Sequence, residues 1–299
     1  MSSAILAEGL VKAYGENRAV DDLSFEVPWG RVTGFLGPNG AGKTTTLRVI
    51  LGLAASTSGR SEVMGAPYVH SATPSRMVGA LLDKQQFHPF RSARNHLRVY
   101  AAASNLADRR VDEVLELVEL SASASKKVGH YSLGMRQRLG LAAALLGDPK
   151  LLILDEPANG LDPSGIRWLR ALLRDYATDE RAVFVSSHLL AEMTQIADEV
   201  VVINRGRLVV HSDVDHLLSR AERGIKVRTD EPERLRDVMT ERSAWAELIA
   251  HDVVLVRGVP VEDIGRAAAA TAIPLFGLDA EVGTLEDVFF ELTQVEVQT

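Results

Sequence analysis

The chain of 299 residues has an ordinary globular composition, 46% apolar and 24% charged, and its formal net charge of −7 provides no basic field of the kind that nucleic-acid binders show. The absence of cysteine excludes disulfide scaffolds, thiolate zinc sites and cysteine-ligated iron–sulfur clusters. Residues 1–20 hold no continuous apolar stretch of a secretory signal, and the most apolar segment, 139–147, is far shorter than the roughly 20 residues that span a bilayer. If the protein works on a membrane, another chain must therefore span it.

A phosphate-binding turn is predicted between a strand and a helix. Residues 32–36 form a short apolar run, and 43–51 have a helical pattern that ends at Gly52. The turn between them matches G-x-x-x-x-G-K-[ST], the P-loop, whose backbone N–H groups face phosphate oxygens. Lys43 is expected to reach the β- and γ-phosphates of ATP, and the Thr44 hydroxyl to bind Mg²⁺. The predicted nucleotide-binding residues of this segment are Gly37, Pro38, Asn39, Gly40, Ala41, Gly42, Lys43, Thr44 and Thr45.

Helical and buried-strand patterns alternate through the middle of the chain. Apolar residues repeat at i, i+3, i+4 and i+7 between 108 and 120, which predicts an amphipathic helix. Residues 151–154 and 182–186 are predicted strands that are covered on both faces, as in a parallel α/β sheet. Two more helices are predicted, one that follows Asp162 as its N-cap and one over 189–197.

Two acids, Asp155 and Glu156, follow the strand 151–154. The carboxyl end of a strand is where open α/β sheets bind their ligands. Together with the P-loop, this position predicts that Asp155 holds the hydration shell of Mg²⁺ and that Glu156 polarises the attacking water as the catalytic base. Taken alone, the pair would fit a strand end with two solvated acids equally well.

The pattern changes after about residue 220. A charged stretch is followed by a weaker alternation of strands and helices over 225–229, 231–240, 252–257, 260–270, 274–278 and 284–293. This pattern predicts a small appended α+β domain.

Other segments resemble the ATP-binding subunits of ATP-binding cassette (ABC) transporters. Residues 131–138 resemble the ABC signature, with Leu133 and Met135 in place of the usual glycine and glutamine. Residues 160–162 resemble the D-loop, and His188 follows a predicted strand as the switch histidine does. The SLGM form of the signature is similar to that of drug and antibiotic exporter ATPases.

The resemblance covers roughly residues 3–220 and implies an α/β fold. It predicts a P-loop NTPase (RecA-like) core with an antiparallel β-subdomain and a helical subdomain at about 84–146. The cassette would span 1–222, and the α+β accessory domain would span 223–299.

The resemblance also implies roles for residues outside the P-loop. Ser132 and Gly134 would grip the γ-phosphate of ATP, Asp162 would belong to the same cofactor-binding set, and His188 would donate to the γ-phosphate as a catalytic residue beside Glu156 and Lys43. Tyr14 stands where the family places an aromatic ring on adenine, although a tyrosine packed within a β-subdomain is the alternative.

The Q-loop is the weakest match. The family has Gln or Glu about 40 residues after the P-loop lysine, where this chain has Asp83, followed closely by Gln85. Asp83 is the predicted third metal ligand beside Thr44 and Asp155, with Gln85 or a solvated turn as alternatives. The aromatic cluster at 87–90 fits either a docking site for a helix of a membrane partner or packing inside the helical subdomain.

The resemblance implies a peripheral protein at the cytoplasmic face of the cell membrane. It would need ATP and Mg²⁺, a membrane-spanning permease and a second ATPase cassette, expected to be a copy of this chain. Export of an antibiotic, drug or lipid-like compound is the expected activity, because the signature has the exporter form. The rival hypotheses are a soluble ABC ATPase that acts on nucleic acid or ribosomes, and a P-loop metabolite kinase, which would explain neither signature nor D-loop.

Overall fold

The structure is a computed structural model that describes residues 3–82, 87–178, 180–220 and 224–281. It divides into two compact units, Met1–Val214 and Asp215–Thr299, each of which is described by itself. The predicted domain boundary at 222/223 falls within a segment, 221–223, that lies outside the described residues, so it stays a prediction. No helix in the described ranges is long and apolar enough to cross a membrane.

The main sheet of the first unit is mostly parallel. Among the described residues it has six strands in the order β5-β6-β7-β3-β8-β9, and only β9 runs antiparallel to its neighbour. Its strands are β3 (Val32–Leu36), β5 (Val78–Leu81), β6 (Leu151–Asp155), β7 (Ala182–Ser187), β8 (Glu199–Asn204) and β9 (Arg207–Asp213). The strands predicted at 32–36, 151–154 and 182–186 are confirmed as β3, β6 and β7, in which every residue is buried.

Helices lie between these strands in the chain. In the described part of the first unit they are α1 (Lys43–Ile50), α2 (Pro74–Met77), α3 (Ala93–Ala103), α4 (Arg109–Leu117), α5 (Leu133–Leu145), α6 (Pro163–Tyr176) and α7 (Leu190–Met193). Helix α8 (Val214–Arg220) follows β9 and begins where the second unit begins. Helix α4 confirms the amphipathic helix predicted at 108–120, and α6 follows Asp162 as predicted.

The helix predicted over 189–197 is wrong in its length, because α7 ends at Met193. The N–H groups of Gln195 and Ile196 bond to carbonyls three residues earlier, which tightens the chain into turns. The chain has to turn here because β8 begins at Glu199.

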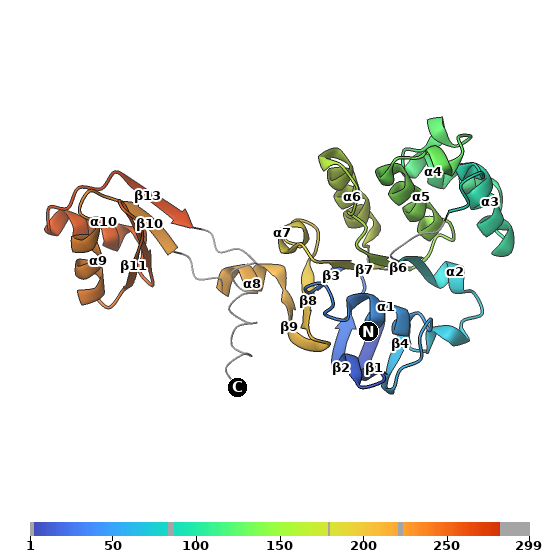
Figure 1. Ribbon diagram of the computed structural model, residues 1–299, viewed down its shortest axis with the longest axis horizontal. Helices are drawn as coiled ribbons and strands as arrows, with labels where there is room; N and C mark the ends of the chain where they lie inside the picture. The colour runs from blue at the N-terminus through green and yellow to red at the C-terminus, as the bar shows by residue number, and fades with distance from the viewer. Residues whose placement is uncertain (1–2, 83–86, 179, 221–223, 282–299) are drawn as a thin grey trace. The chain divides into compact units, whose positions relative to one another are not determined.

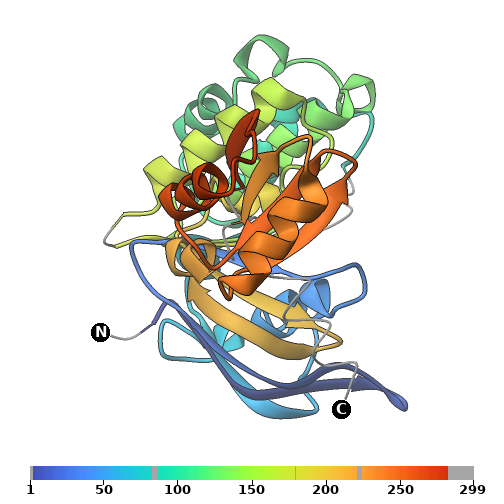
Figure 2. The same cartoon turned by 90° about the vertical axis from the view of Figure 1, so that its left-hand side faces the viewer.

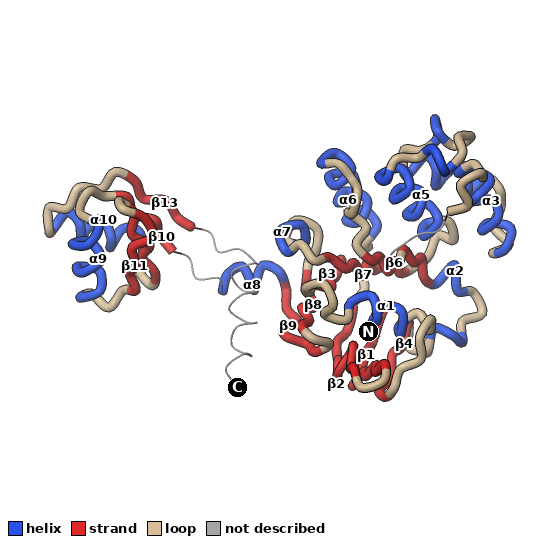
Figure 3. Tube along the Cα trace, viewed as in Figure 1, coloured by secondary structure: helices blue, strands red, loops and turns tan. Residues whose placement is uncertain are grey.

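An antiparallel sheet packs against the main sheet. In the described part of the chain it has three strands in the order β2-β1-β4, with β1 (Ile5–Tyr14), β2 (Asn17–Val27) and β4 (Ser58–Val63). This sheet and α1 lie on one side of the main sheet, and α5 and α6 lie on the other (Figures 1 and 3). The long strands β1 and β2 form the dark blue ribbon in Figure 2.

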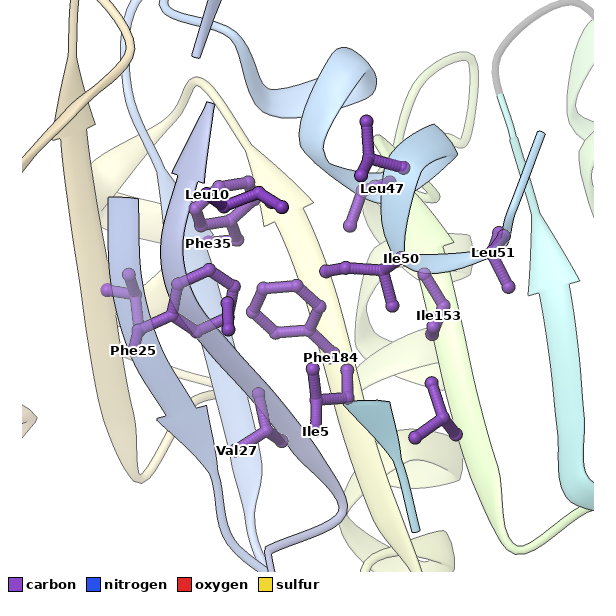
Figure 4. Close-up of a cluster of buried hydrophobic side chains, with 14 of the residues drawn as sticks. Ile5, Leu10, Phe25, Val27, Phe35, Leu47, Ile50, Leu51, Ile153 and Phe184 are labelled. Atoms are coloured by element: carbon purple, nitrogen blue, oxygen red, sulfur yellow. The ribbon is translucent and has the colours of Figure 1, made fainter. Parts of the chain in front are cut away.

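The core of the first unit lies between α1 and the two sheets. Phe25 of β2, Phe35 of β3 and Phe184 of β7 are buried with ring centroids 5.0–5.6 Å apart, and Leu47 and Ile50 of α1 complete the cluster (Figure 4). Aromatic packing of this kind stabilises a core beyond the area that it buries. It therefore fixes α1, and with it the turn that precedes α1, against β3, β6 and β7.

The second unit is an α+β structure with its own core. Within the described residues it has a four-stranded antiparallel sheet of order β11-β12-β10-β13. Its elements are β10 (Gly224–Arg228), α9 (Pro232–Glu241), β11 (Trp245–Ala250), β12 (Val253–Arg257), α10 (Val261–Ala270) and β13 (Gly277–Glu281). The sequence did not predict β11, and the helix predicted at 284–293 lies outside the described residues.

Candidate functional site

The P-loop segment is held by close backbone contacts. Gly42, the N-cap of α1, has φ = 105°, and a Cβ built on it would lie 2.3 Å from the carbonyl oxygen of Ala19. Gly37 follows β3, and its Cβ would lie 2.5 Å from the Ile203 oxygen. Both positions therefore require glycine. The turn leads directly into the N-terminus of α1, which is the positive end of the helix dipole. A helix N-terminus of this kind favours the binding of an anion.

Lys43 is buried at the start of α1. Its Nζ donates to the carbonyl oxygens of Gly37 (2.6 Å) and Pro38 (3.3 Å), and it lies 3.6 Å from Glu156 Oε1. The ammonium group therefore lies inside the turn and faces the acid at the end of β6, where it is close to any phosphate bound by the turn.

Asp155 joins the P-loop helix to two neighbouring strands. Thr44 Oγ1 donates to Asp155 Oδ2 over 2.7 Å, and Ser186 Oγ donates to Asp155 Oδ1 over 2.5 Å. Asp155 is buried, so its carboxylate is held by these two hydroxyls rather than by bulk water.

Glu156 has an unusual backbone and a paired side chain. Its φ is 51°, which is uncommon for a residue other than glycine. Its N–H donates to Ser186 Oγ (3.0 Å) and Ser186 O (3.2 Å), and its carbonyl accepts from Gln137 Nε2 (3.4 Å). The carboxylate lies between Lys43 and His188, whose Nδ1 is 2.8 Å from Glu156 Oε2.

One further acid, Glu192 of α7, belongs to the same electrostatic environment. Burial raises the pKa of Glu192 above its ordinary value, Arg170 and His188 oppose this rise, and the charge of Glu156 adds to it. The sequence did not single out Glu192.

These groups surround a pocket of about 360 Å³. It is lined by Ala19, Pro38, Asn39, Gly40, Gly42, Lys43, Thr44, Thr45, Asp155, Glu156, Asn159 and His188. The predicted residues Gly37 and Ala41 are not part of this lining. Sequence reasoning missed Ala19, which carries no local signal, and Asn159, whose position three residues after Glu156 could have indicated it.

The other predicted nucleotide-binding residues lie outside this lining. Ser132 caps α5, where its Oγ accepts from the Met135 N–H (3.2 Å). Gly134 follows it, and a Cβ there would lie 3.0 Å from the carbonyl oxygen of Gly160. The signature segment and the predicted D-loop are therefore in contact with each other.

Asp162 caps α6. Its Oδ1 accepts from the Gly165 N–H (2.8 Å), and its Oδ2 accepts from the Ser164 hydroxyl (2.9 Å). The bond from the Gly165 N–H, and after it the Ser164 hydroxyl, holds the pKa of Asp162 below its ordinary value of 3.8.

Tyr14 ends β1 and is 53% exposed, with Lys12 Nζ 4.7 Å from its ring centroid. The two Q-loop candidates, Asp83 and Gln85, lie outside the described residues. In the described ranges no group of three or more His, Cys, Asp or Glu residues could hold a metal by itself.

The chain is similar to known proteins in sequence and in fold. A family model described as "ABC transporter" matches residues 20–159, and a model of a domain of unknown function matches 223–286. The bacitracin transport ATP-binding protein BcrA of Bacillus licheniformis is 38% identical over 86% of this chain and 85% of its own length. The lantibiotic transport ATP-binding protein SrtF of Streptococcus pyogenes is 33% identical over 70% of this chain and 90% of its own length. A solved ATP-binding subunit of an ABC transporter superposes with a TM-score of 0.66 at 26% identity, over 73% of this chain and 93% of that one.

Proposed function

The chain belongs to the ATP-binding subunits of ABC transporters, ATPases that power transport, and we propose that its hydrolysis takes place in the pocket between Lys43, Asp155 and Glu156. The observation that supports this most is the Glu156 carboxylate, which lies between a buried lysine and a histidine beside the P-loop. A carboxylate in this position can polarise a water for attack on a phosphate.

The pocket residues fit a nucleotide and Mg²⁺. The turn at 37–42 and the N-terminus of α1 offer backbone N–H groups to phosphates, with Lys43 beside them. Thr44 and Asp155 would supply two oxygen ligands to the ion, a hydroxyl and a carboxylate that lie within hydrogen-bond distance of each other. Mg²⁺ in nucleotide sites is held by few protein oxygens, with water and phosphates completing its coordination. When bound, the ion would neutralise charge on the β- and γ-phosphates.

Each residue of the pocket then has a distinct task. Lys43 balances the negative charge of the phosphates, and Glu156 Oε1 or Oε2 accepts the proton of the attacking water. His188 contacts the Glu156 carboxylate through Nδ1. Its other ring nitrogen, Nε2, is proposed to donate a hydrogen bond to the γ-phosphate.

The site is proposed to be completed by a second copy of this chain. Ser132, Gly134 and Asp162 do not line the described pocket of their own chain, although the signature segment is implied to grip a γ-phosphate. Ser132 stands at the N-terminus of α5, a helix of 13 residues whose positive end suits an anion. In a head-to-tail pair, the signature of one copy would face the P-loop of the other.

The transport partner is proposed to be a membrane-spanning permease, with this chain bound to it at the cytoplasmic face. The substrate class is proposed to be an antibiotic such as bacitracin or a lantibiotic. The names of two relatives refer to the transport of these compounds. Susceptibility of cells that express this chain with its membrane subunit, with and without Glu156→Gln, tests the class. Equal susceptibility of the two strains to both compounds would exclude it.

The hydrolytic role of Glu156 is tested by Glu156→Gln, which keeps the size of the side chain and removes its basicity. We expect kcat to fall by about 10²–10⁴-fold. ATP affinity, measured by nucleotide titration, should stay near that of the unmodified chain because the P-loop is intact. Normal turnover in Glu156→Gln would remove Glu156 from this role.

A further inference from the structure

We infer that Ser186 is a positioning residue of the ATPase site, whose hydroxyl fixes Asp155 and Glu156 relative to each other. The inference rests on the functions proposed above for these two acids. Ser186 lies on β7, is fully buried, and is the register partner of Asp155 on β6. It does not line the pocket, so it acts through the two acids and not on the nucleotide.

The direction of both hydrogen bonds of Ser186 is determined by chemistry. The Glu156 N–H can only donate, so Ser186 Oγ is the acceptor over 3.0 Å. The single hydroxyl proton of Ser186 is then free to donate to Asp155 Oδ1, 2.5 Å away. One hydroxyl therefore binds the backbone of the proposed base and the carboxylate of the proposed metal ligand at the same time.

The Asp155 carboxylate depends on this bond. Its Oδ2 already accepts from Thr44. Because Asp155 is only 3% exposed, bulk water has little access to replace a lost donor at Oδ1. A buried acceptor that loses its partner keeps its full desolvation penalty. Without Ser186 Oγ, the carboxylate is expected to reorient, and Thr44 would lose its alignment with it.

Glu156 depends on the same hydroxyl. A non-glycine residue at φ = 51° persists only where its surroundings hold it. Its N–H donates to Ser186 Oγ and Ser186 O, and its carbonyl accepts from the Asn159 N–H (3.2 Å) and from Gln137 Nε2 (3.4 Å). Loss of Ser186 Oγ would weaken this restraint and with it the alignment of the Glu156 carboxylate toward His188.

Thr33 offers a matched control for a purely structural role. It lies on β3, the strand next to β7, and is fully buried, and its Oγ1 donates over 2.9 Å to the carboxylate of Glu199, which is also buried. Neither Thr33 nor Glu199 lines the pocket. Thr33→Val therefore removes a similar buried hydroxyl–carboxylate bond without touching the site.

The first test uses nucleotide binding without turnover. In full-length Glu156→Gln chains, the affinity for a fluorescent ATP analogue is measured with and without Mg²⁺. Ser186→Ala should leave the Mg²⁺-free affinity unchanged and reduce the gain that Mg²⁺ brings by about 10–100-fold, as the loss of a group that orients a metal ligand typically does. Ser186→Thr should restore the gain, and Thr33→Val should keep it.

The second test measures hydrolysis with Glu156 intact. Ser186→Ala should lower kcat by about 10–100-fold and raise KM for the Mg²⁺ complex of ATP, because Mg²⁺ adds less affinity, whereas Thr33→Val should change neither. Ser186→Cys, which keeps the size and weakens the donor, should show the same loss and replaces Ser186→Ala if that variant does not fold.

The inference is overturned if Ser186→Ala, or Ser186→Cys in its place, affects the Mg²⁺-dependent gain and kcat no more than Thr33→Val does. This outcome differs from failure of the proposed function. If Glu156→Gln itself hydrolyses ATP normally, then the role of Glu156 is wrong. If Glu156→Gln is inactive and the Ser186 variants behave like Thr33→Val, only the role of Ser186 is lost.

Discussion

The pocket residues differ in how far the sequence could predict them. Lys43 and Thr44 belong to one continuous turn whose spacing is set by phosphate geometry, so a local pattern is sufficient to find them. Ala19 lines the pocket because β2 approaches the P-loop, and Ser186, outside the lining, contacts Asp155 because β6 and β7 pair. These contacts are tertiary, and no spacing in the sequence indicates them.

Tyr14 remains a prediction that a binding measurement can test. Its ring is 53% exposed, so it is accessible to a nucleotide base. Tyr14→Ala is expected to weaken ATP binding by about 1–3 kcal/mol through loss of stacking, and Tyr14→Phe should retain affinity because it keeps the ring. Nucleotide titration checks both variants. Unchanged affinity in Tyr14→Ala would leave Tyr14 as a surface residue of the β1–β2 hairpin.

Among the helices and strands, those with strong local signals were predicted best. The buried strand β6 and the capped helix α6 follow the sequence pattern closely. Strand β11 escaped prediction because it is an edge strand whose residues, WAELIA, are half-buried or exposed, so its alternation is weak. Helix α7 is shorter than predicted because the chain must turn before β8 begins. The helix propensities of its residues do not indicate this turn.

Helix α3 contains a buried histidine that predicts a pH dependence of stability. His96 is 4% exposed, its ring nitrogens have no hydrogen-bond partner among the described residues, and it packs edge-on against Phe87 and Tyr100. Burial, and after it the charges of Arg91 and His88, lowers the pKa of His96 below its ordinary value of 6.5. The unfolded chain therefore takes up this proton at a higher pH than the folded chain does.

Acid should accordingly favour unfolding through His96. Its contribution to stability is complete above about pH 6.5, its unfolded pKa, and declines as the pH falls below that value. In His96→Leu, which is similar in size and does not titrate, the free energy of unfolding should fall less between pH 7 and pH 5 than in the native chain. Denaturant titrations at a series of pH values measure this, and parallel curves for the two proteins would contradict it.

At the scale of the whole molecule, the two units have separate cores. The cluster around Phe35 and Phe184 draws only on the first unit, and the cluster around Val227 and Val254 draws only on the second. The proposed chemistry belongs to the first unit alone, because the pocket and the signature segment both lie before residue 190. Composition and periodicity predicted an appended α+β unit. No sequence motif in this unit indicates what it does.

The proposed ATPase cycle depends on the pairing of two chains. Ser132 is proposed to bind ATP and does not line the described pocket of its own chain, and we therefore propose that a complete site needs two copies. Glu156→Gln should bind ATP without hydrolysing it and so accumulate in the closed, paired state.

The most direct test is the mass of Glu156→Gln in solution, measured by light scattering with and without ATP and Mg²⁺. We predict that ATP with Mg²⁺ doubles the mass, and that adding Ser132→Arg, which places a bulky side chain at the shared phosphate, prevents the doubling while each chain still binds ATP. A Glu156→Gln chain that is saturated with ATP and Mg²⁺ and keeps the same mass as without nucleotide would rule out the proposed pairing.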